Sequence, residues 1–382
     1  MLRLAEAADG LLARVRLPGG LVSGGQLLVL AGLAGELGDG RVELTSRGNV
    51  QLRGLRADAA GSLTGKLTGA GLLPSLRHDR VRNVLASPLA GLDHGIDLTG
   101  VIRALDAGLC ASERLAELPG RFLFAIDDGR GDVAGLGADV VATVRTDRAA
   151  VSGLAVAVDD VPGVMLASAE AFLALRSGDG GAAWRVADLP GGADRVRAAV
   201  AARFGLAAAR DEAGTPGSAG AAATARPAGL VARHETDGGM ESAASVRDDP
   251  GASAVLIAPL GRLTAAQLTW VAERAGKRES RITPWRSVVL PHLADAPGVL
   301  REAAGLGFGT DERSPWLRVT ACAGRPGCAS ALADVQADAA GFAGRWPGRV
   351  VHVSGCERHC GRPAATEIDV TATSEGYQVA GV

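Results

Sequence analysis

Four cysteines near the C-terminus form the pattern with the clearest chemical meaning in this chain. They lie in two pairs, Cys322-Ala-Gly-Arg-Pro-Gly-Cys328 and Cys356-Glu-Arg-His-Cys360. Two pairs of thiolates on separate loops can hold an iron–sulfur cubane. Zinc is a weaker alternative because its cysteine pairs usually have two to four residues between them, and disulfides are typical of oxidising compartments. The spacing therefore predicts a 4Fe-4S cluster bound by these four cysteines.

A second pattern concentrates arginines in residues 41–53, which read Arg-Val-Glu-Leu-Thr-Ser-Arg-Gly-Asn-Val-Gln-Leu-Arg. Polar and apolar residues alternate, and this predicts one β-strand with a polar face. A sheet face open to water is the plainer explanation. However, arginines beside amide side chains also suit a flat ligand rich in carboxylates. The polar face would present Arg41, Glu43, Thr45, Arg47, Asn49, Gln51 and Arg53.

The elements that must position these residues occur twice. Residues 18–27 begin with Pro-Gly-Gly, end with Gln-Leu and resemble residues 259–268. Each segment precedes a helix, the first predicted over residues 23–37, and then an arginine-bearing strand. The second such strand is predicted over residues 281–290, with Arg286 in the place of Arg47. An earlier strand, which ends at the first Pro-Gly-Gly, places Arg14 and Arg16 on one face. We therefore predict two diverged copies of one unit, separated by a flexible linker at residues 208–227.

The overall composition excludes some classes of protein. The chain has 382 residues and a net charge of −2, so no strong field favours nucleic acid or a membrane surface. No signal peptide is visible, and no apolar run approaches the ~20 residues of a membrane span. We therefore expect a cytoplasmic protein, where cysteines stay reduced.

The order of these segments resembles the nitrite and sulfite reductase family. The resemblance rests on Pro-Gly-Gly and its helix, on residues 45–55 and 82–91, and on a second half that ends in the cysteine pairs. It implies an α+β fold with pseudo-twofold duplication, made of ferredoxin-like half-domains and two α/β modules. The expected parts are a half-domain at 1–75, an α/β module at 76–207, the linker at 208–227, a second half-domain at 228–305 and a cluster-binding α/β module at 306–382.

Within this family, the chain most resembles the precorrin-3B synthases. It is short for an assimilatory reductase, and the segments around its cysteines are similar to those of this branch. Sulfite reductases hold their small oxyanion with a basic pair in an LPRKFK stretch, which here reads Leu-Pro-Gly-Arg-Phe-Leu at residues 118–123. Arg121 retains one cation, but Leu123 removes the other. Reduction of sulfite without this pair is unfavourable.

The resemblance implies oxygen-dependent hydroxylation of precorrin-3A and lactone formation in aerobic cobalamin biosynthesis, which is a monooxygenase activity. The substrate would occupy the pocket that holds sirohaem in the reductases. A sirohaem-dependent nitrite or sulfite reductase is the alternative, in which Cys360 bridges cluster and haem. A simple electron-transfer or tetrapyrrole-binding protein is a third possibility. The implied catalytic residues are Arg47 and Arg121, and the implied substrate-binding residues are Arg14, Arg16, Arg47, Asn49, Gln51, Arg53, Arg82 and Asn83.

The same resemblance bears on cofactors and partners. A separate mononuclear non-haem iron is a further option, for which the sequence identifies no ligands. The sequence contains no GxGxxG fingerprint of a nicotinamide domain, so electrons are expected from an external NADH-derived reductase or a ferredoxin. The expected partners are therefore precorrin-3A, O2 and this donor, without nucleic acid or membrane.

Overall fold

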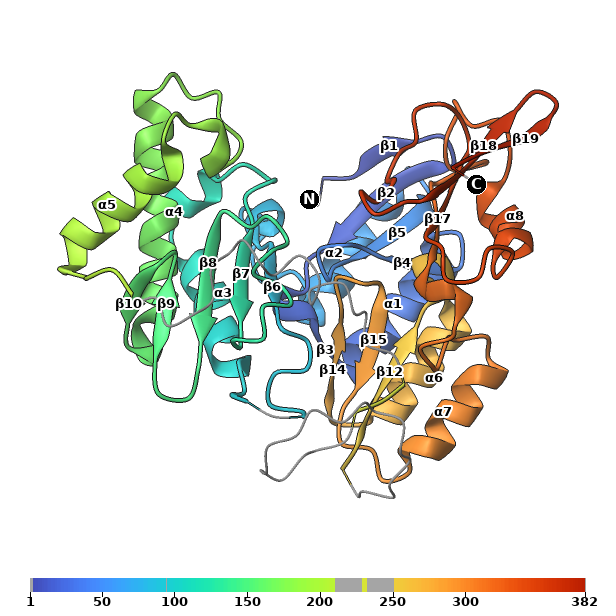
Figure 1. The fold of residues 1–382 in the computed structure, drawn as a ribbon, viewed down its shortest axis with the longest axis horizontal. Helices are drawn as coiled ribbons and strands as arrows, with labels where there is room; N and C mark the ends of the chain where they lie inside the picture. Colours follow the sequence, from blue (N-terminus) through green and yellow to red (C-terminus); the bar gives the residue numbers. More distant parts are fainter. Residues whose placement is uncertain (1–2, 94, 210–228, 232–250, 382) are drawn as a thin grey trace.

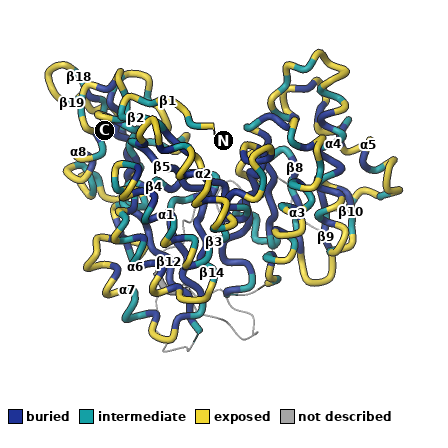
Figure 2. The backbone as a smooth tube through the Cα atoms, turned by 180° about the vertical axis from the view of Figure 1, so that it is seen from behind, coloured by how far each residue is buried: buried dark blue, intermediate teal, exposed yellow. Residues whose placement is uncertain are grey.

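The computed structural model describes residues 3–93, 95–209, 229–231 and 251–381, and these residues form two lobes that meet along one side (Figure 1). Buried residues run through the strands of both lobes, whereas exposed residues lie on outer helices and loops (Figure 2). Most of the predicted linker at residues 208–227 lies outside the described residues. Within them, no helix is long and apolar enough to cross a membrane.

Two five-stranded sheets form the centre of the larger lobe, in the orders β1-β2-β5-β4-β13 and β11-β12-β15-β14-β3. Strand β3 is antiparallel to β14, and β13 is antiparallel to β4. Each half of the chain therefore contributes one strand to the sheet of the other half, as a pseudo-twofold duplication requires. The bounds are β1 (Ala5–Ala7), β2 (Gly10–Val15), β3 (Leu21–Ser23), β4 (Arg41–Leu44), β5 (Val50–Leu55), β11 (Gly229–Val231), β12 (Ser253–Ile257), β13 (Arg262–Thr264), β14 (Glu279–Ile282) and β15 (Ser287–Leu290).

The repeated segments form equivalent turns and helices. Helix α1 (Gly24–Leu37) has a capping box between Ser23 and Gln26, and α6 (Ala265–Ala275) has one between Thr264 and Gln267. Each cap satisfies backbone N–H groups that the first helical turn leaves unpaired, and is worth about 1 kcal/mol. The two helices pack against each other in one core, with α2 (Ala59–Gly69) beside α1 and α7 (Ala296–Gly305) beside β12. The predicted helix and the predicted repeat are confirmed.

The prediction of one strand over residues 41–53 is wrong, because the segment folds into the hairpin β4–β5. Thr45 N–H donates to the carbonyl of Asn49 at 2.9 Å, and Gly48 N–H donates to the carbonyl of Thr45 at 3.1 Å. Gly48 has a φ of 63°, a left-handed conformation that glycine adopts without strain. The apolar pairs Val42–Leu52 and Leu44–Val50 face each other across the hairpin, so alternation persists through the turn and mimics a longer strand.

The second copy repeats this hairpin in β14–β15, so the single strand predicted at residues 281–290 is also wrong. Thr283 N–H donates to the carbonyl of Ser287, and Arg286 N–H donates to the carbonyl of Thr283. These contacts match those of Thr45 and Gly48, and Arg286 has a φ of 59°. Arg286 is therefore the equivalent of Gly48, one position later than predicted, and Trp285 stands in the place of Arg47.

The smaller lobe is an α/β unit with the sheet order β10-β9-β8-β7-β6. Strands β6, β7 and β8 are parallel and are covered by three helices. The rings of Phe122, Phe124 and Phe172 pack in its core, with centroids 5.0–5.1 Å apart along the chain of contacts. The bounds are β6 (Val84–Ala86), β7 (Phe124–Asp127), β8 (Val140–Val144), β9 (Ala149–Val151), β10 (Leu154–Val156), α3 (Thr99–Ala111), α4 (Val161–Gly178) and α5 (Gly192–Phe204).

The C-terminal segment forms a four-stranded sheet of β16 (Val319–Ala321), β17 (Val351–Ser354), β18 (Ile368–Thr373) and β19 (Gly376–Ala380). The first three strands are parallel, and α8 (Val335–Phe342) packs on one face over a small apolar core. Parallel strands end at the same edge of a sheet, so the loops that follow β16 and β17 are neighbours. These two loops carry the four cysteines.

Candidate functional site

The two cysteine loops are bonded to each other where β16 and β17 end. Cys322 N–H donates to the carbonyl of Val353 at 3.0 Å, and Leu332 N–H donates to the carbonyl of Gly355 at 2.8 Å. Gly355 N–H points at Cys322 Sγ at 3.1 Å. Cys322, Cys328 and Cys356 are half-buried, and Cys360 is exposed. Strand pairing therefore brings the two predicted ligand loops together.

The surroundings of these loops fit an iron–sulfur cluster. Thiolate is the ligand that such clusters require, and backbone N–H groups directed at sulfur stabilise its charge. His352 on β17 is fully buried, and its Nδ1 lies 2.9 Å from Thr320 Oγ1. Its Nε2 has no partner among the described residues. Burial lowers the pKa of His352 to about 4, so its ring is neutral beside the Cys360 loop.

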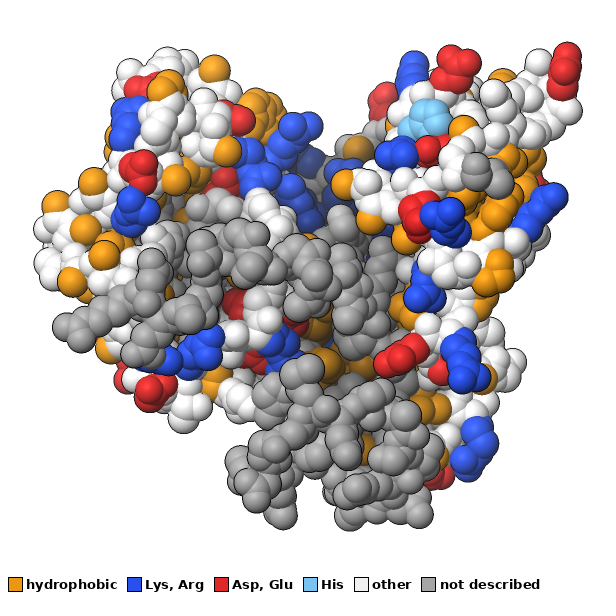
Figure 3. Space-filling view, in the orientation of Figure 1, with side chains coloured by type: hydrophobic (Ala, Val, Ile, Leu, Met, Phe, Trp, Pro, Cys, Tyr) orange, Lys and Arg blue, Asp and Glu red, His pale blue; other side chains and the backbone are white. Residues whose placement is uncertain are grey.

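Three of the predicted substrate-binding arginines lie near the segment that contains Arg121. They are Arg14, Arg16 and Arg47. Arg16 donates from Nε to Asn83 at 2.9 Å, while its Nη1 is buried and has no partner in the described part of the chain. Burial lowers its pKa to about 10, with the Arg14 and Arg47 charges acting in the same direction. Arg47 makes long contacts of 3.4 Å with the carbonyl groups of Gly120 and Arg121. Arginines also gather on the wall of a hollow between the lobes (Figure 3).

The other predicted substrate-binding side chains make contacts within the protein. Arg53 is only 7% exposed, binds Asp9 through two bonds of 3.0 Å, and donates to the carbonyl of Gly327 at 2.8 Å. It thereby fastens β5 to the first cysteine loop. Gln51 donates to Glu43 at 2.8 Å, and Asn49 accepts from the Leu17 N–H at 2.8 Å. In this structure these side chains shape the site, and direct contact with substrate stays a prediction.

Arg82 and Asn83 have similar internal roles. Arg82 forms a bidentate pair with Asp106 at 2.7 and 2.8 Å and donates to the carbonyl of Leu72. Asn83 donates to the carbonyl groups of Arg80, Gly120 and Phe122. Asn83 also accepts the bond from Arg16, so it links Arg16 to Gly120 and Phe122, the two neighbours of Arg121.

Replacing Arg82 by leucine should lower the free energy of unfolding by about 3 kcal/mol, because the variant leaves the Asp106 carboxylate without its partner. Urea unfolding followed by circular dichroism measures this change. The matched control is Arg77→Leu, since Arg77 pairs with Glu113 on the exposed surface. That substitution should cost less than about 1 kcal/mol. Equal stability of the two variants would contradict the structural role of Arg82.

Arg121 and Leu123 lie in different environments although they are two residues apart. Arg121 is exposed, and its guanidinium lies 5.8 Å from the ring centre of Trp184. Leu123 is 3% exposed and packs in a small apolar cluster with Leu85, Ala125 and Val133.

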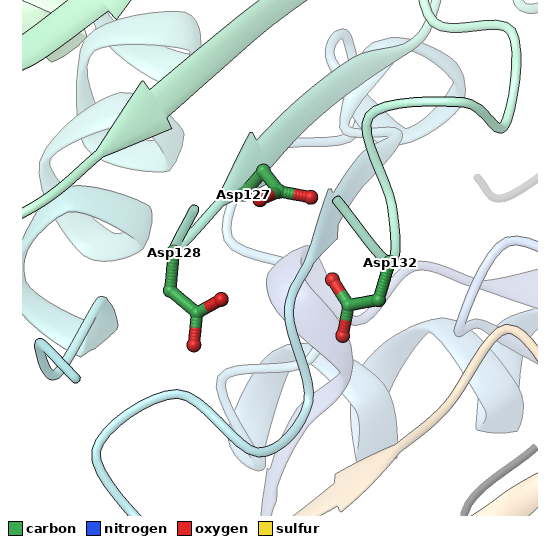
Figure 4. Close-up of side chains that lie close together, drawn as sticks. All are labelled: Asp127, Asp128 and Asp132. Carbon is green, nitrogen blue, oxygen red and sulfur yellow. The ribbon is translucent and has the colours of Figure 1, made fainter. Parts of the chain in front are cut away.

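Sequence reasoning did not identify a group of three carboxylates at the end of β7. Asp127, Asp128 and Asp132 lie close together (Figure 4), and they are the one group in the described ranges whose acidic oxygens approach within 4.8 Å. The stretch Asp-Asp-Gly-Arg-Gly-Asp at residues 127–132 is the sequence feature that could have indicated this group, because it holds three acidic residues within six positions.

The contacts of these carboxylates explain the group without a metal ion. Asp127 accepts four backbone N–H bonds from residues 129–134. Asp128 pairs with Arg130, and Asp132 accepts from Ser87 Oγ at 2.5 Å. Burial raises the pKa of Asp132 to about 6. The group fastens the loop after β7 to the loop after β6.

Comparison with known proteins identifies relatives. Residues 4–69 match the family described as Nitrite/Sulfite reductase ferredoxin-like half domain. The chain is 27% identical to a ferredoxin–nitrite reductase of Synechococcus elongatus, over 97% of this chain and 78% of that protein. It is also 27% identical to a precorrin-3B synthase of a Sinorhizobium species, over 97% of this chain and 79% of that protein.

A solved structure shows the same fold. The NirA protein of Mycobacterium tuberculosis superposes with a TM-score of 0.69 at 20% identity, over 97% of this chain and 74% of that one. Its agreement extends to nearly all of this chain, including both ferredoxin-like sheets. Together with the duplicated sheets, it shows that the chain has the nitrite/sulfite reductase fold, and residues 4–69 form the ferredoxin-like half domain that matches the family.

Proposed function

We propose that this chain is a precorrin-3B synthase, an oxygen-dependent oxidoreductase of cobalamin biosynthesis. The observation that carries the proposal is the burial of Leu123 in an apolar cluster, which leaves Arg121 as the one cation of the stretch that binds a small oxyanion in sulfite reductases. Arg16 supports it, because this arginine lies close to Arg14 and Arg47 and has a buried donor without a partner among the residues that the structure describes. An unsatisfied buried donor is costly unless a ligand completes it.

The residues of the chain bind and orient the macrocycle in this proposal. Arg14, Arg16 and Arg47 hold carboxylate arms of precorrin-3A, since a guanidinium matches a carboxylate bidentately. Arg121, whose carbonyl accepts from Arg47, stabilises negative charge at the reacting edge. A 4Fe-4S cluster held by Cys322, Cys328, Cys356 and Cys360 would supply single-electron transfer.

The reaction balances with one equivalent of O2 and an external reductant. One oxygen atom becomes the C20 hydroxyl group, and the other leaves as water with two electrons and two protons. The carboxyl group of an acetate arm adds to the neighbouring ring carbon to close the γ-lactone, and its proton passes to the new hydroxyl oxygen. The two electrons come from a separate NADH-derived reductase or ferredoxin. The protein acts in the cytoplasm, without nucleic acid or membrane partners.

A sirohaem-dependent nitrite or sulfite reductase is the second candidate. It is favoured by the Synechococcus nitrite reductase, which matches this chain at the same identity and coverage as the precorrin-3B synthase. In that case the site would hold sirohaem as a resident cofactor that supplies the reduction of the oxyanion, with Cys360 as a ligand of the neighbouring cluster.

Incubation of the purified protein with precorrin-3A and a reduced donor, with and without O2, tests the proposal. The proposal requires a hydroxylated lactone, identified by mass spectrometry, in the aerobic sample alone. Product formation in the absence of O2 would remove the oxygenase assignment while leaving the fold unaffected.

A further inference from the structure

A cavity of about 430 Å³ opens in the smaller lobe beside the segment of Arg121. Its wall includes Gly120, whose carbonyl contacts Arg47 and Asn83, so the cavity adjoins the candidate site through one residue. Sites for organic ligands typically have volumes of about 300–1,000 Å³. The cavity is too large for nitrite or sulfite alone and matches one edge of a macrocycle.

The charge of this cavity is unbalanced. Arg3, Arg77, Arg80 and Arg176 line it, against the two carboxylates of Asp79 and Glu117, and Arg77 is paired with Glu113 outside the lining. The lining therefore favours an anionic ligand.

Arg80 is the arginine best placed to bind such an anion. Its side chain donates no hydrogen bond within the described residues, in contrast to Arg176, whose Nε donates to the carbonyl of Ala183 at 2.7 Å. A Cβ atom on Gly120 would lie 3.4 Å from Nε of Arg80 and 3.5 Å from its Nη2. Arg80 is itself exposed, and its guanidinium lies beside Gly120, whose carbonyl contacts Arg47.

Trp184 gives the cavity an aromatic wall. Its side chain is 51% exposed although it is large and apolar, and Arg121 covers its ring at 5.8 Å. The N–H groups of Trp184 and Arg185 both donate to Asp188 at 2.9 Å, which fixes the loop that carries the ring. An exposed aromatic ring beside arginines suits a flat conjugated ligand with anionic arms.

We propose that this cavity is a subsite for one carboxylate-bearing edge of a tetrapyrrole, with Arg80 binding an arm and Trp184 packing against the ring system. This inference rests on the proposed function for its ligand class, and neither residue belongs to the set predicted from the sequence. A metal-free precorrin and an iron-bound sirohaem share the required chemistry, so the test must separate them.

Titration with uroporphyrin III, a metal-free and redox-inert tetrapyrrole octacarboxylate, measures the subsite without turnover. The dissociation constant should rise about tenfold in Arg80→Gln, from the loss of a charge-assisted bond, and about threefold in Trp184→Leu. Arg80→Lys should recover only part of the affinity, since an ammonium lacks the planar fork. The matched controls are Arg203→Gln and Phe204→Leu, a second arginine–aromatic contact that lies outside the cavity lining.

Three comparisons decide the outcome. Unchanged affinity for both uroporphyrin III and sirohaem in Arg80→Gln and Trp184→Leu, with melting curves like wild type, would overturn the subsite. Repeating the titration with sirohaem identifies the source: a loss confined to sirohaem indicates a resident cofactor, and a loss with uroporphyrin indicates metal-free tetrapyrrole. If the variants lose affinity but wild type yields no oxygen-dependent product, the proposed function fails and the subsite stands. If both variants bind tetrapyrrole and form product as wild type does, the subsite fails and the proposed function stands.

Discussion

Replacement of Cys356 by alanine should abolish the iron–sulfur cluster, with iron and sulfide content falling to background. A cubane needs a ligand on each iron, and a missing thiolate leaves one iron open to loss. The two cysteine loops are bonded to each other through Leu332 and Gly355, so the defect at Cys356 also reaches the loop of Cys322. Alanine at Cys322, Cys328 or Cys360 should have the same effect. The measurement is iron and sulfide analysis with absorption spectra of anaerobically purified protein.

Cys110 provides the control for this experiment. It lies on α3 in the other lobe, near Asp106, and burial raises the pKa of its thiol, which disfavours the thiolate that iron binds. Cys110→Ala should retain the full cluster. A complete cluster in Cys356→Ala would contradict the ligand assignment, and one zinc per chain without iron would replace the cluster with a structural metal site.

Nitrite and sulfite reduction should be at least about a hundredfold slower than in an assimilatory reductase, even with added sirohaem and a strong reductant. A charged donor lost from a water-excluded site costs roughly 3 kcal/mol in the transition state. Leu123 takes the place of that donor, and its side chain is buried among apolar residues instead of facing the hollow. Arg121, the remaining cation of the stretch, stacks on Trp184.

Steady-state assays with reduced methyl viologen, scored by ammonium or sulfide formed, measure these rates. The spectrum of the reconstituted sample confirms that sirohaem is bound before the rate is read. Turnover comparable to a ferredoxin–nitrite reductase would favour the second candidate function over the first.

The sequence predicted local features of the fold better than long-range pairing. The two capping boxes at Ser23 and Thr264 are short-range signals, and both helices begin there. Exchange of β3 and β13 between the sheets joins residues more than two hundred positions apart, and alternation within one strand contains no information about its partner. The hairpins were read as single strands because an apolar and a polar face continue through the turn.

Prediction from the sequence was similarly limited for the arginines of the predicted substrate site. The sequence indicated a polar face suited to a ligand, but Asn49, Gln51 and Arg53 are buried, and the acidic partners of Arg53 and Arg82 are distant in sequence. Asp9 and Asp106 each form a two-bond pair with one of these guanidinium groups. By contrast, the spare donor of Arg16 and the accessible Arg80 emerge only when the burial of each atom is known.

Mass spectrometry of the product formed under 18O2 tests the central claim most directly. Wild-type protein, precorrin-3A and a reduced donor should yield a lactone that contains one heavy oxygen atom, in its C20 hydroxyl group. The same reaction in 18O-labelled water, with ordinary O2, should leave that hydroxyl group unlabelled. A product whose hydroxyl oxygen comes from water, or no product in a sample with an intact cluster and bound precorrin-3A, would contradict the assignment as an oxygen-dependent precorrin-3B synthase.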